Sequence, residues 1–168
     1  MEAELAGRIV HGLKAAGIDF MTYLPESRLS QILPLLREDG TVQMVPTASE
    51  QEAITIAAGA SLGGKRVAVY MESTGPYVSA YSLLTIGKQM GVPMLLLIGF
   101  LGDFADQRNS FLYATIGTRM TPTLDGLGID YRVLEDGQNL ERHIKDAQRT
   151  SDGMRAPTAL IFSGDFAE

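Results

Sequence analysis

The 168 residues suit one domain of ordinary size, and a hydrophobic fraction of 45% provides a core, which argues against a disordered protein. A net charge of -6, with no basic cluster longer than Lys65-Arg66, argues against nucleic-acid binding. No apolar run reaches the ~18 residues of a membrane-spanning helix. Because cysteine is absent and the N-terminus is acidic, we expect a cytoplasmic protein without a thiolate metal site.

Helical and strand patterns alternate along the whole chain. In chain order, the pattern predicts a helix over 5–16, a strand over 18–24, a helix over 29–36, a strand over 41–45, a helix over 50–62, a strand over 66–71, a helix over 77–90, a strand over 94–98, a helix over 111–127, a strand over 129–134, a helix over 136–151 and a strand over 158–162. We expect Pro34 to kink or divide its helix, and the helix after residue 110 to divide around Gly117 and Pro122.

Six strands separated by helices indicate a single-domain α/β fold over residues 1–168. We expect a doubly wound parallel six-stranded sheet with helices on both faces. Ligands of such sheets collect at the carboxyl ends of the strands. The segments that leave those ends are 25–27, 46–50, 72–77 and 99–110. These polar or glycine-rich segments are predicted to wall one pocket.

Segment 47–60 begins a helix directly after a strand and places two glutamates in the first turn. Both Thr47-x-x-Glu50 and Ser49-x-x-Glu52 match the capping box, in which the glutamate binds the start of its own helix. Capping is therefore the first interpretation of this segment. Glu52 lies about 200° round the helix from Glu50, so the two carboxylates cannot share a pocket. We interpret Glu52 as a capping or solvent residue.

A family resemblance gives Glu50 a second interpretation. The motifs SEQEA at 49–53, AAGA at 57–60 and GK at 64–65 are similar to the glutamate helix of thiamin-diphosphate-dependent decarboxylases and synthases. STGP at 73–76 resembles the turn that follows in those enzymes. Motifs at 23–27, 58–66 and 117–129 most resemble the small alpha subunits of sulfopyruvate and phosphonopyruvate decarboxylases. The resemblance covers about residues 19–134.

The resemblance implies a role for the residues near this helix. Glu50 would be the catalytic glutamate, which exchanges a proton with a ring nitrogen of thiamin diphosphate and so activates the cofactor toward a 2-oxo acid. The residues implied to contact the cofactor are Glu50, Pro25, Thr74, Gly75 and Pro76.

The substrate side departs from the family pattern. Segment 112–117 resembles the Leu-His-His-Thr-Leu-Gly segment of pyruvate decarboxylases, but Tyr113 and Ala114 replace both histidines. Proton relay then falls to Tyr113, Gln107 or a residue of a partner, with packing an equal alternative for Tyr113. Tyr77 and Tyr81 replace smaller residues of relatives and would fill space, stack on the substrate or pack. The substrate-side candidates are Ser27, Tyr77, Tyr81, Gln107 and Tyr113.

Charged ligands require further groups. A doubly charged substrate needs a cation, and the candidates, each with a solvated-surface alternative, are Arg28, Lys88, Arg108 and Arg119. The family holds the diphosphate through Mg²⁺ bound by a Gly-Asp-Gly motif with a later asparagine, and this sequence lacks that pair. The resemblance therefore implies a beta subunit that binds Mg²⁺, and an active hetero-oligomer.

Three functions remain open. The first is the alpha subunit of a two-component thiamin-diphosphate-dependent 2-oxo acid decarboxylase of sulfopyruvate or phosphonopyruvate type, a carboxy-lyase active only with its partner. The second is a carboligating subunit that forms acyloins or aldehydes with the same cofactor. The third is a non-catalytic scaffold subunit of the same fold.

Overall fold

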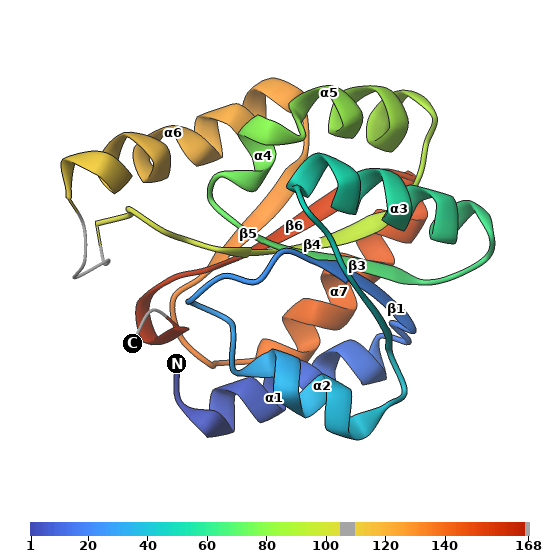
Figure 1. The fold of residues 1–168 in the computed structure, drawn as a ribbon, viewed down its shortest axis with the longest axis horizontal. Helices are drawn as coiled ribbons and strands as arrows, with labels where there is room; N and C mark the ends of the chain where they lie inside the picture. The colour runs from blue at the N-terminus through green and yellow to red at the C-terminus, as the bar shows by residue number, and fades with distance from the viewer. Residues whose placement is uncertain (105–109, 167–168) are drawn as a thin grey trace.

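A six-stranded parallel sheet forms the middle layer of the computed structural model, which describes residues 1–104 and 110–166 (Figure 1). The strands lie in the order β2-β1-β3-β4-β6-β5, and every neighbouring pair is parallel. Their bounds are β1 Phe20–Tyr23, β2 Gln43–Pro46, β3 Val67–Glu72, β4 Met94–Gly99, β5 Asp130–Leu134 and β6 Pro157–Phe162. The predicted doubly wound parallel sheet is confirmed.

Helices cover both faces of this sheet (Figure 1). One face carries α1 (Ala3–Ala15), α2 (Ile32–Asp39) and α7 (Leu140–Met154). The other carries α3 (Glu50–Leu62), α4 (Gly75–Val78), α5 (Ala80–Ser82), the π-helical segment η1 (Leu83–Gln89) and α6 (Phe111–Leu127). A 3₁₀ turn, η2 (Gly164–Phe166), follows β6.

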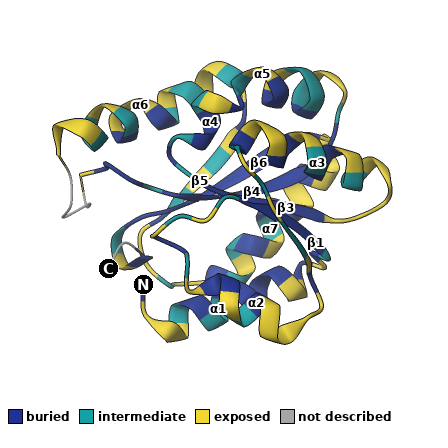
Figure 2. Ribbon diagram, viewed as in Figure 1, coloured by how far each residue is buried: buried dark blue, intermediate teal, exposed yellow. Residues whose placement is uncertain are grey.

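The core lies on both sides of the central strands. Every residue of β4 and β6 is buried (Figure 2). For β4, the continuous apolar run over 94–98 predicts this burial, because it suits a strand covered on two faces. Side chains alternate between the faces: Leu95 and Leu97 join the core beneath α1 and α7, whereas Leu96 and Ile98 join the core beneath α3 and α6. Within the described residues, no helix has both the length and the apolar character needed to cross a membrane.

Two prolines interrupt the helices less than expected. Pro34 is the third residue of α2, where the backbone N–H has no partner within the helix, so α2 is one helix and the expected division does not occur. The division expected in α6 is also wrong, because Phe111–Leu127 is one continuous helix that contains Pro122.

The last helix begins later than its sequence pattern predicts. Asp136 Oδ1 accepts a hydrogen bond of 2.8 Å from the backbone N–H of Gln138, and Asn139 has a left-handed φ of 52°. Both features form a turn rather than a first helical turn. Helix α7 therefore starts at Leu140 instead of residue 136.

A bidentate ion pair joins helices α1 and α7, and it makes the free energy of unfolding depend on pH. Arg8 Nε and Nη2 donate to the two carboxylate oxygens of Glu141 at 2.8 and 2.9 Å, and Arg8 lowers the pKa of Glu141 from its ordinary 4.5 to about 2. Because the pKa of Glu141 is lower in the folded state than in the unfolded state, the ion pair stabilises the fold fully at pH values above about 4.5. This stabilisation is lost as the pH falls toward 2. We expect Glu141→Gln to lower the free energy of unfolding at pH 7 by about 0.5–1 kcal/mol.

Urea denaturation at pH 7 and pH 3 measures this contribution. The exposed Glu38 of α2 provides the matched control Glu38→Gln, for which we expect no loss. Equal effects of the two substitutions at pH 7 would contradict the prediction.

Candidate active site

The chain changes direction across the sheet between β1 and β3. From β1 it passes through α2 to the edge strand β2, and from there through α3 to β3 on the other side of β1. In open parallel sheets, ligand crevices form at the carboxyl ends of strands at such a switch point. The segments 24–30, 47–49 and 73–74 leave the strands or enter the helices at this edge.

Glu50 is the first residue of α3, and its side chain is directed into the protein. The residue is only 6% exposed. Its Oε1 accepts a hydrogen bond of 3.0 Å from Thr74 Oγ1, and its Oε2 makes no hydrogen bond within the described part of the chain. Glu50 therefore presents a buried carboxylate with one oxygen fixed and the other available to a ligand.

A different glutamate caps the helix. Ser49 Oγ accepts from the backbone N–H of Glu52 at 3.2 Å, and Glu52 Oε2 accepts from the backbone N–H of Ala48 at 2.7 Å. Thr47, the other predicted cap, donates its hydroxyl to the carbonyl of Tyr23. The capping interpretation is thus confirmed for Glu52, whereas Glu50 makes no contact with its own backbone.

Glu26 shapes the loop that follows β1. Its carboxylate accepts from the backbone N–H groups of Arg28 and Leu29, both at 2.6 Å, and from the hydroxyl of Tyr70. Burial first, and then the charge of Glu26, raise the pKa of Tyr70, so this hydroxyl stays a donor. All these contacts are structural, and they fix the loop against β3.

A small pocket lies at the same edge of the sheet. Its volume is about 170 Å³, and its walls are Ser27, Glu72, Leu101 and Tyr113. Two predicted substrate-side residues, Ser27 and Tyr113, therefore come together from the loop after β1 and from α6. At ~30 Å³ per water the pocket has room for roughly five or six waters, which suits a small acid. It is smaller than the ~300–1,000 Å³ of sites that enclose cofactors.

The turn between β3 and α4 is tightly packed. A Cβ added at Gly75 would lie 2.1 Å from Met71 Sδ and 3.0 Å from Met71 Cβ, so a larger residue there would displace the Met71 side chain. Pro76 is buried beside it, whereas Pro25 is exposed in the loop after β1. Ser73 Oγ accepts from the backbone N–H of Leu101 at 2.8 Å and ties this turn to the segment after β4.

The two unusual tyrosines do not line the small pocket. Tyr77 donates its hydroxyl to the carbonyl of Ile116 at 2.5 Å and so fastens α4 to α6, which favours the packing alternative. Tyr81 is 75% exposed on α5.

The four candidate cations lie in different places. Arg28 is 2% exposed in the loop after β1, at the edge where the pocket opens. Lys88 binds the carbonyl of Gly128 at the end of α6, and Arg119 is exposed on α6, so neither lies at this edge. Arg108 and the substrate-side candidate Gln107 lie outside the described residues.

Glu72, the last residue of β3, is a site residue that the sequence reasoning missed. It is half-buried, lines the pocket and lies 3.3 Å from Thr74 Oγ1. Burial is the main cause that raises its pKa, with Glu26 and Glu50 adding to the shift while Thr74 and Arg28 oppose it. A signal existed: Glu72 is a carboxylate that ends an otherwise apolar strand at the ligand-binding edge. Among the described residues, no group of three His, Cys, Asp or Glu side chains could hold a metal ion.

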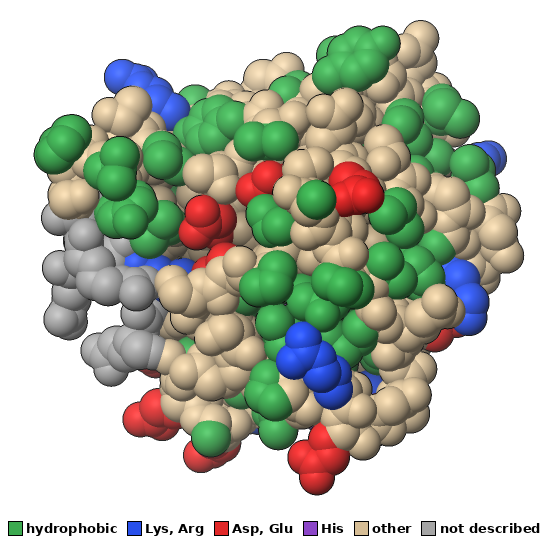
Figure 3. All heavy atoms as spheres, viewed as in Figure 1, with side chains coloured by type: hydrophobic (Ala, Val, Ile, Leu, Met, Phe, Trp, Pro, Cys, Tyr) green, Lys and Arg blue, Asp and Glu red, His purple; other side chains and the backbone are tan. Residues whose placement is uncertain are grey.

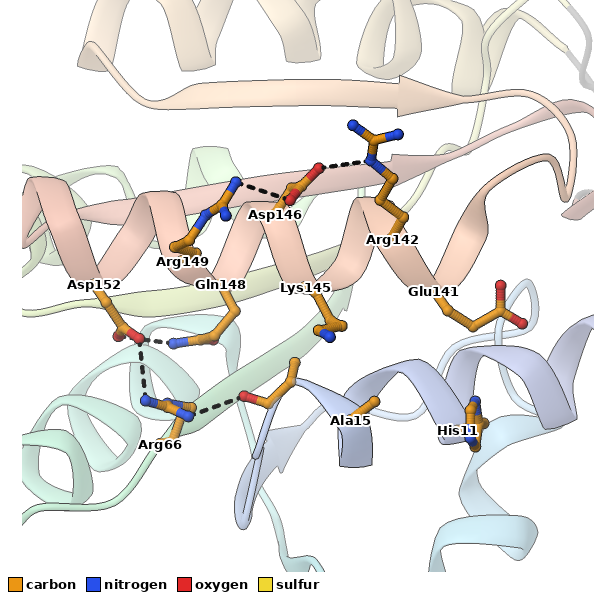
Figure 4. Close-up of a pocket in the computed structure, with 11 residues that line it drawn as sticks. His11, Ala15, Arg66, Glu141, Arg142, Lys145, Asp146, Gln148, Arg149 and Asp152 are labelled. Atoms are coloured by element: carbon orange, nitrogen blue, oxygen red, sulfur yellow. Dashed lines mark hydrogen bonds and ion pairs between the residues drawn. The ribbon is translucent and has the colours of Figure 1, made fainter.

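A larger groove lies between α1 and α7, on the opposite face of the sheet from α3 (Figure 4). Its volume is about 660 Å³. Several of its charged groups pair with one another: Asp152 pairs with Arg66 at 3.4 Å, and Asp146 pairs with Arg149 at 3.0 Å. The groove offers no buried carboxyl group, so the edge near Glu50 is the better candidate.

Comparisons with known proteins agree with this choice. Residues 3–127 match the family described as "Thiamine pyrophosphate enzyme, N-terminal TPP binding domain". The chain is 35% identical over 160 residues to sulfopyruvate decarboxylase subunit alpha of Methanocaldococcus jannaschii, covering 95% of this chain and 94% of that one. It is 28% identical over 153 residues to the protein of the same name in Methanococcus maripaludis, covering 91% and 90%.

A solved structure shares the fold. The 2-oxoglutarate:ferredoxin oxidoreductase of Magnetococcus marinus aligns with a TM-score of 0.73 at 17% identity, over 97% of this chain and 29% of that chain. Together with the family match over most of the sequence, the alignment leads to one conclusion. The chain belongs to the thiamine pyrophosphate enzymes and forms their N-terminal TPP binding domain.

Proposed function

We propose that the chain is the alpha subunit of a two-component 2-oxo acid decarboxylase, in which Glu50 activates thiamin diphosphate. The observation that carries the proposal is the state of Glu50: it is 6% exposed, fixed by Thr74 through one oxygen and not used to cap its helix. The two relatives named above carry the name sulfopyruvate decarboxylase subunit alpha.

The residues at this edge fit the cofactor's aminopyrimidine side. Glu50 Oε2 would hold the ring nitrogen, and Pro25, Thr74, Gly75 and Pro76 are the further residues proposed to contact the cofactor. When bound, the cofactor supplies the nucleophilic carbon and the electron sink that decarboxylation requires. Glu50 exchanges the proton, and the buried surroundings exclude water from that exchange.

A partner subunit would complete the site. The small pocket is too small for the whole cofactor, and the chain lacks the family's Mg²⁺ motif, so the diphosphate and Mg²⁺ are assigned to a beta subunit. Hydrophobic side chains gather over α4, α5 and α6 (Figure 3). The large exposed ones in this region are Val78, Tyr81, Leu84, Phe104, Phe111 and Leu112. Such a surface suits a permanent interface with that subunit.

The substrate proposed is a 2-oxo acid with a second anionic group, sulfopyruvate or phosphonopyruvate. Arg28 is the candidate cation at the correct edge, and its buried guanidinium would bind a sulfonate or phosphonate strongly. The pocket volume of about 170 Å³ suits an acid of this size.

Reconstitution tests this function. The chain would be combined with a beta subunit that carries the Mg²⁺ motif, and with thiamin diphosphate and Mg²⁺, and carbon dioxide release would be measured with sulfopyruvate, phosphonopyruvate and pyruvate. We expect release from a doubly charged acid, and none from either subunit alone. If acyloin products form and the expected aldehyde is not released, the chain is instead the subunit of a carboligating enzyme. The scaffold role predicts instead that the isolated chain functions without a partner that carries the cofactor. That result would contradict the proposal.

A further inference from the structure

The hydroxyl of Thr74 lies between two carboxyl groups. Its Oγ1 is 3.0 Å from Glu50 Oε1 and 3.3 Å from Glu72 Oε1. A hydroxyl carries one hydrogen, so it can donate to only one of them at a time. If both glutamates are ionised, one carboxylate faces an oxygen lone pair without a hydrogen between them. If Glu72 carries a proton, it can donate to Thr74, and Thr74 can donate to Glu50.

The surroundings of Glu72 favour its protonated form. Its burial, together with the nearby carboxylates of Glu26 and Glu50, opposes a further negative charge. Arg28 acts in the opposite direction, and Tyr113 lines the same pocket. The balance of these groups raises the pKa of Glu72.

Glu72 also connects two parts of the site. Its side chain lines the pocket formed with Ser27, Leu101 and Tyr113, whereas Glu50 lies at the start of α3. The hydroxyl of Thr74 is the contact that joins them. A proton can therefore pass between the pocket wall and Glu50 without crossing bulk solvent.

We propose that Glu72, Thr74 and Glu50 form a proton relay that serves the catalytic glutamate. In the forward direction the O–H bond of Glu72 breaks as its proton binds Thr74 Oγ1, and the original hydroxyl proton of Thr74 passes to Glu50 Oε1. Glu72 becomes a carboxylate, Glu50 becomes a carboxylic acid, and the total charge is unchanged. Glu72 is thus a positioning residue that acts through Thr74, and this role rests on the proposed function of Glu50.

The first test needs neither cofactor nor partner. The full chain, with ¹³C in the glutamate side-chain carboxyl groups, would be titrated by NMR, with Glu72→Gln and Glu50→Gln used to assign the two signals. We expect Glu72 to titrate above the exposed glutamates, and each signal to respond to the titration of the other. Thr74→Val, which removes the hydroxyl, should change the coupling and leave only the direct charge–charge interaction of the two carboxyl groups, whereas Thr74→Ser should preserve the wild-type coupling. Independent titration in the wild type, or coupling unchanged by Thr74→Val, would overturn the relay.

The second test uses the reconstituted enzyme. We expect Glu72→Gln and Thr74→Val to lower kcat about tenfold to a hundredfold, at or below the lower limit of what a direct general acid–base group contributes, because Glu72 acts through Thr74. Because Glu72 must be protonated to donate, we expect kcat of the wild type to fall as the pH rises and Glu72 loses its proton. In Glu72→Gln this fall should be absent from the pH profile. Glu72→Asp and Thr74→Ser should restore part of the rate. An unchanged rate and pH profile in Glu72→Gln would contradict the inference.

The two tests separate the relay from the proposed function. If the wild-type pair decarboxylates no 2-oxo acid while the titrations remain coupled through Thr74, the proposed function fails and the hydrogen-bonded relay stands. If decarboxylation occurs but the titrations are independent, the relay fails alone. Urea denaturation of each variant identifies a loss of folding, and the near-isosteric Thr74→Val provides the test if Glu72→Gln does not fold.

Discussion

Replacing Glu50 by glutamine is expected to lower cofactor-dependent decarboxylation by the reconstituted pair at least about a hundredfold, within the range that general acid–base groups contribute. An amide has almost the shape of the carboxyl group and can still accept the hydrogen bond from Thr74, so the fold and the assembly should persist. It cannot, however, exchange a proton with a ring nitrogen. The measurement is kcat from carbon dioxide release, with assembly followed by size-exclusion chromatography.

Glu52 gives a matched control in the same helical turn. Its carboxylate caps the helix through Ala48, whereas Thr74 binds Glu50 and Glu72. Glutamine also serves in a capping box, so Glu52→Gln should keep most of the activity. Near-full activity of Glu50→Gln, or equal losses in both variants, would remove Glu50 from the mechanism.

Periodicity predicted most of the fold because local spacing reports which face of an element is buried. The central strand β4 was found as a continuous apolar run, and the order of helices and strands is confirmed. The predicted helix boundaries and interruptions were wrong where a local hydrogen bond, or the position of a residue within its helix, decides the backbone conformation. Asp136 and Asn139 form a turn that delays α7, and Pro34 falls in a first turn that tolerates proline. Spacing of apolar residues carries neither kind of information.

The site was predictable only where one segment contains the signal. Glu50 lies within a helix motif, but the partner of each carboxylate comes from a distant part of the sequence, Thr74 to Glu50 and Tyr70 to Glu26. The small pocket likewise unites Ser27 and Tyr113, whereas Tyr81 remains exposed. Glu72 was missed because its meaning depends on these non-local neighbours.

A close contact between two backbones holds α6 over the site and makes Gly117 sensitive to substitution. A Cβ at Gly117 would lie 2.1 Å from both the carbonyl carbon and the oxygen of Gly102 and 2.7 Å from the nitrogen of Asp103. Backbone atoms cannot rotate away as the end of a side chain can, so the helix or the loop must move. Since Tyr113 precedes this contact on α6 and Leu101 precedes Gly102, such a movement would also deform the pocket.

We expect Gly117→Ala to lower the free energy of unfolding by about 3 kcal/mol, the upper end of the usual range for overpacking, because backbone meets backbone. Gly126→Ala is the matched control in the same helix. An added Cβ there meets nothing within 4 Å, and alanine favours helix by roughly 0.5–1 kcal/mol, so this variant should be neutral or more stable. Urea denaturation of the isolated chain measures both values. Similar stability of the two variants would show that α6 is free to shift, and that the contact at Gly102 does not hold the pocket wall in place.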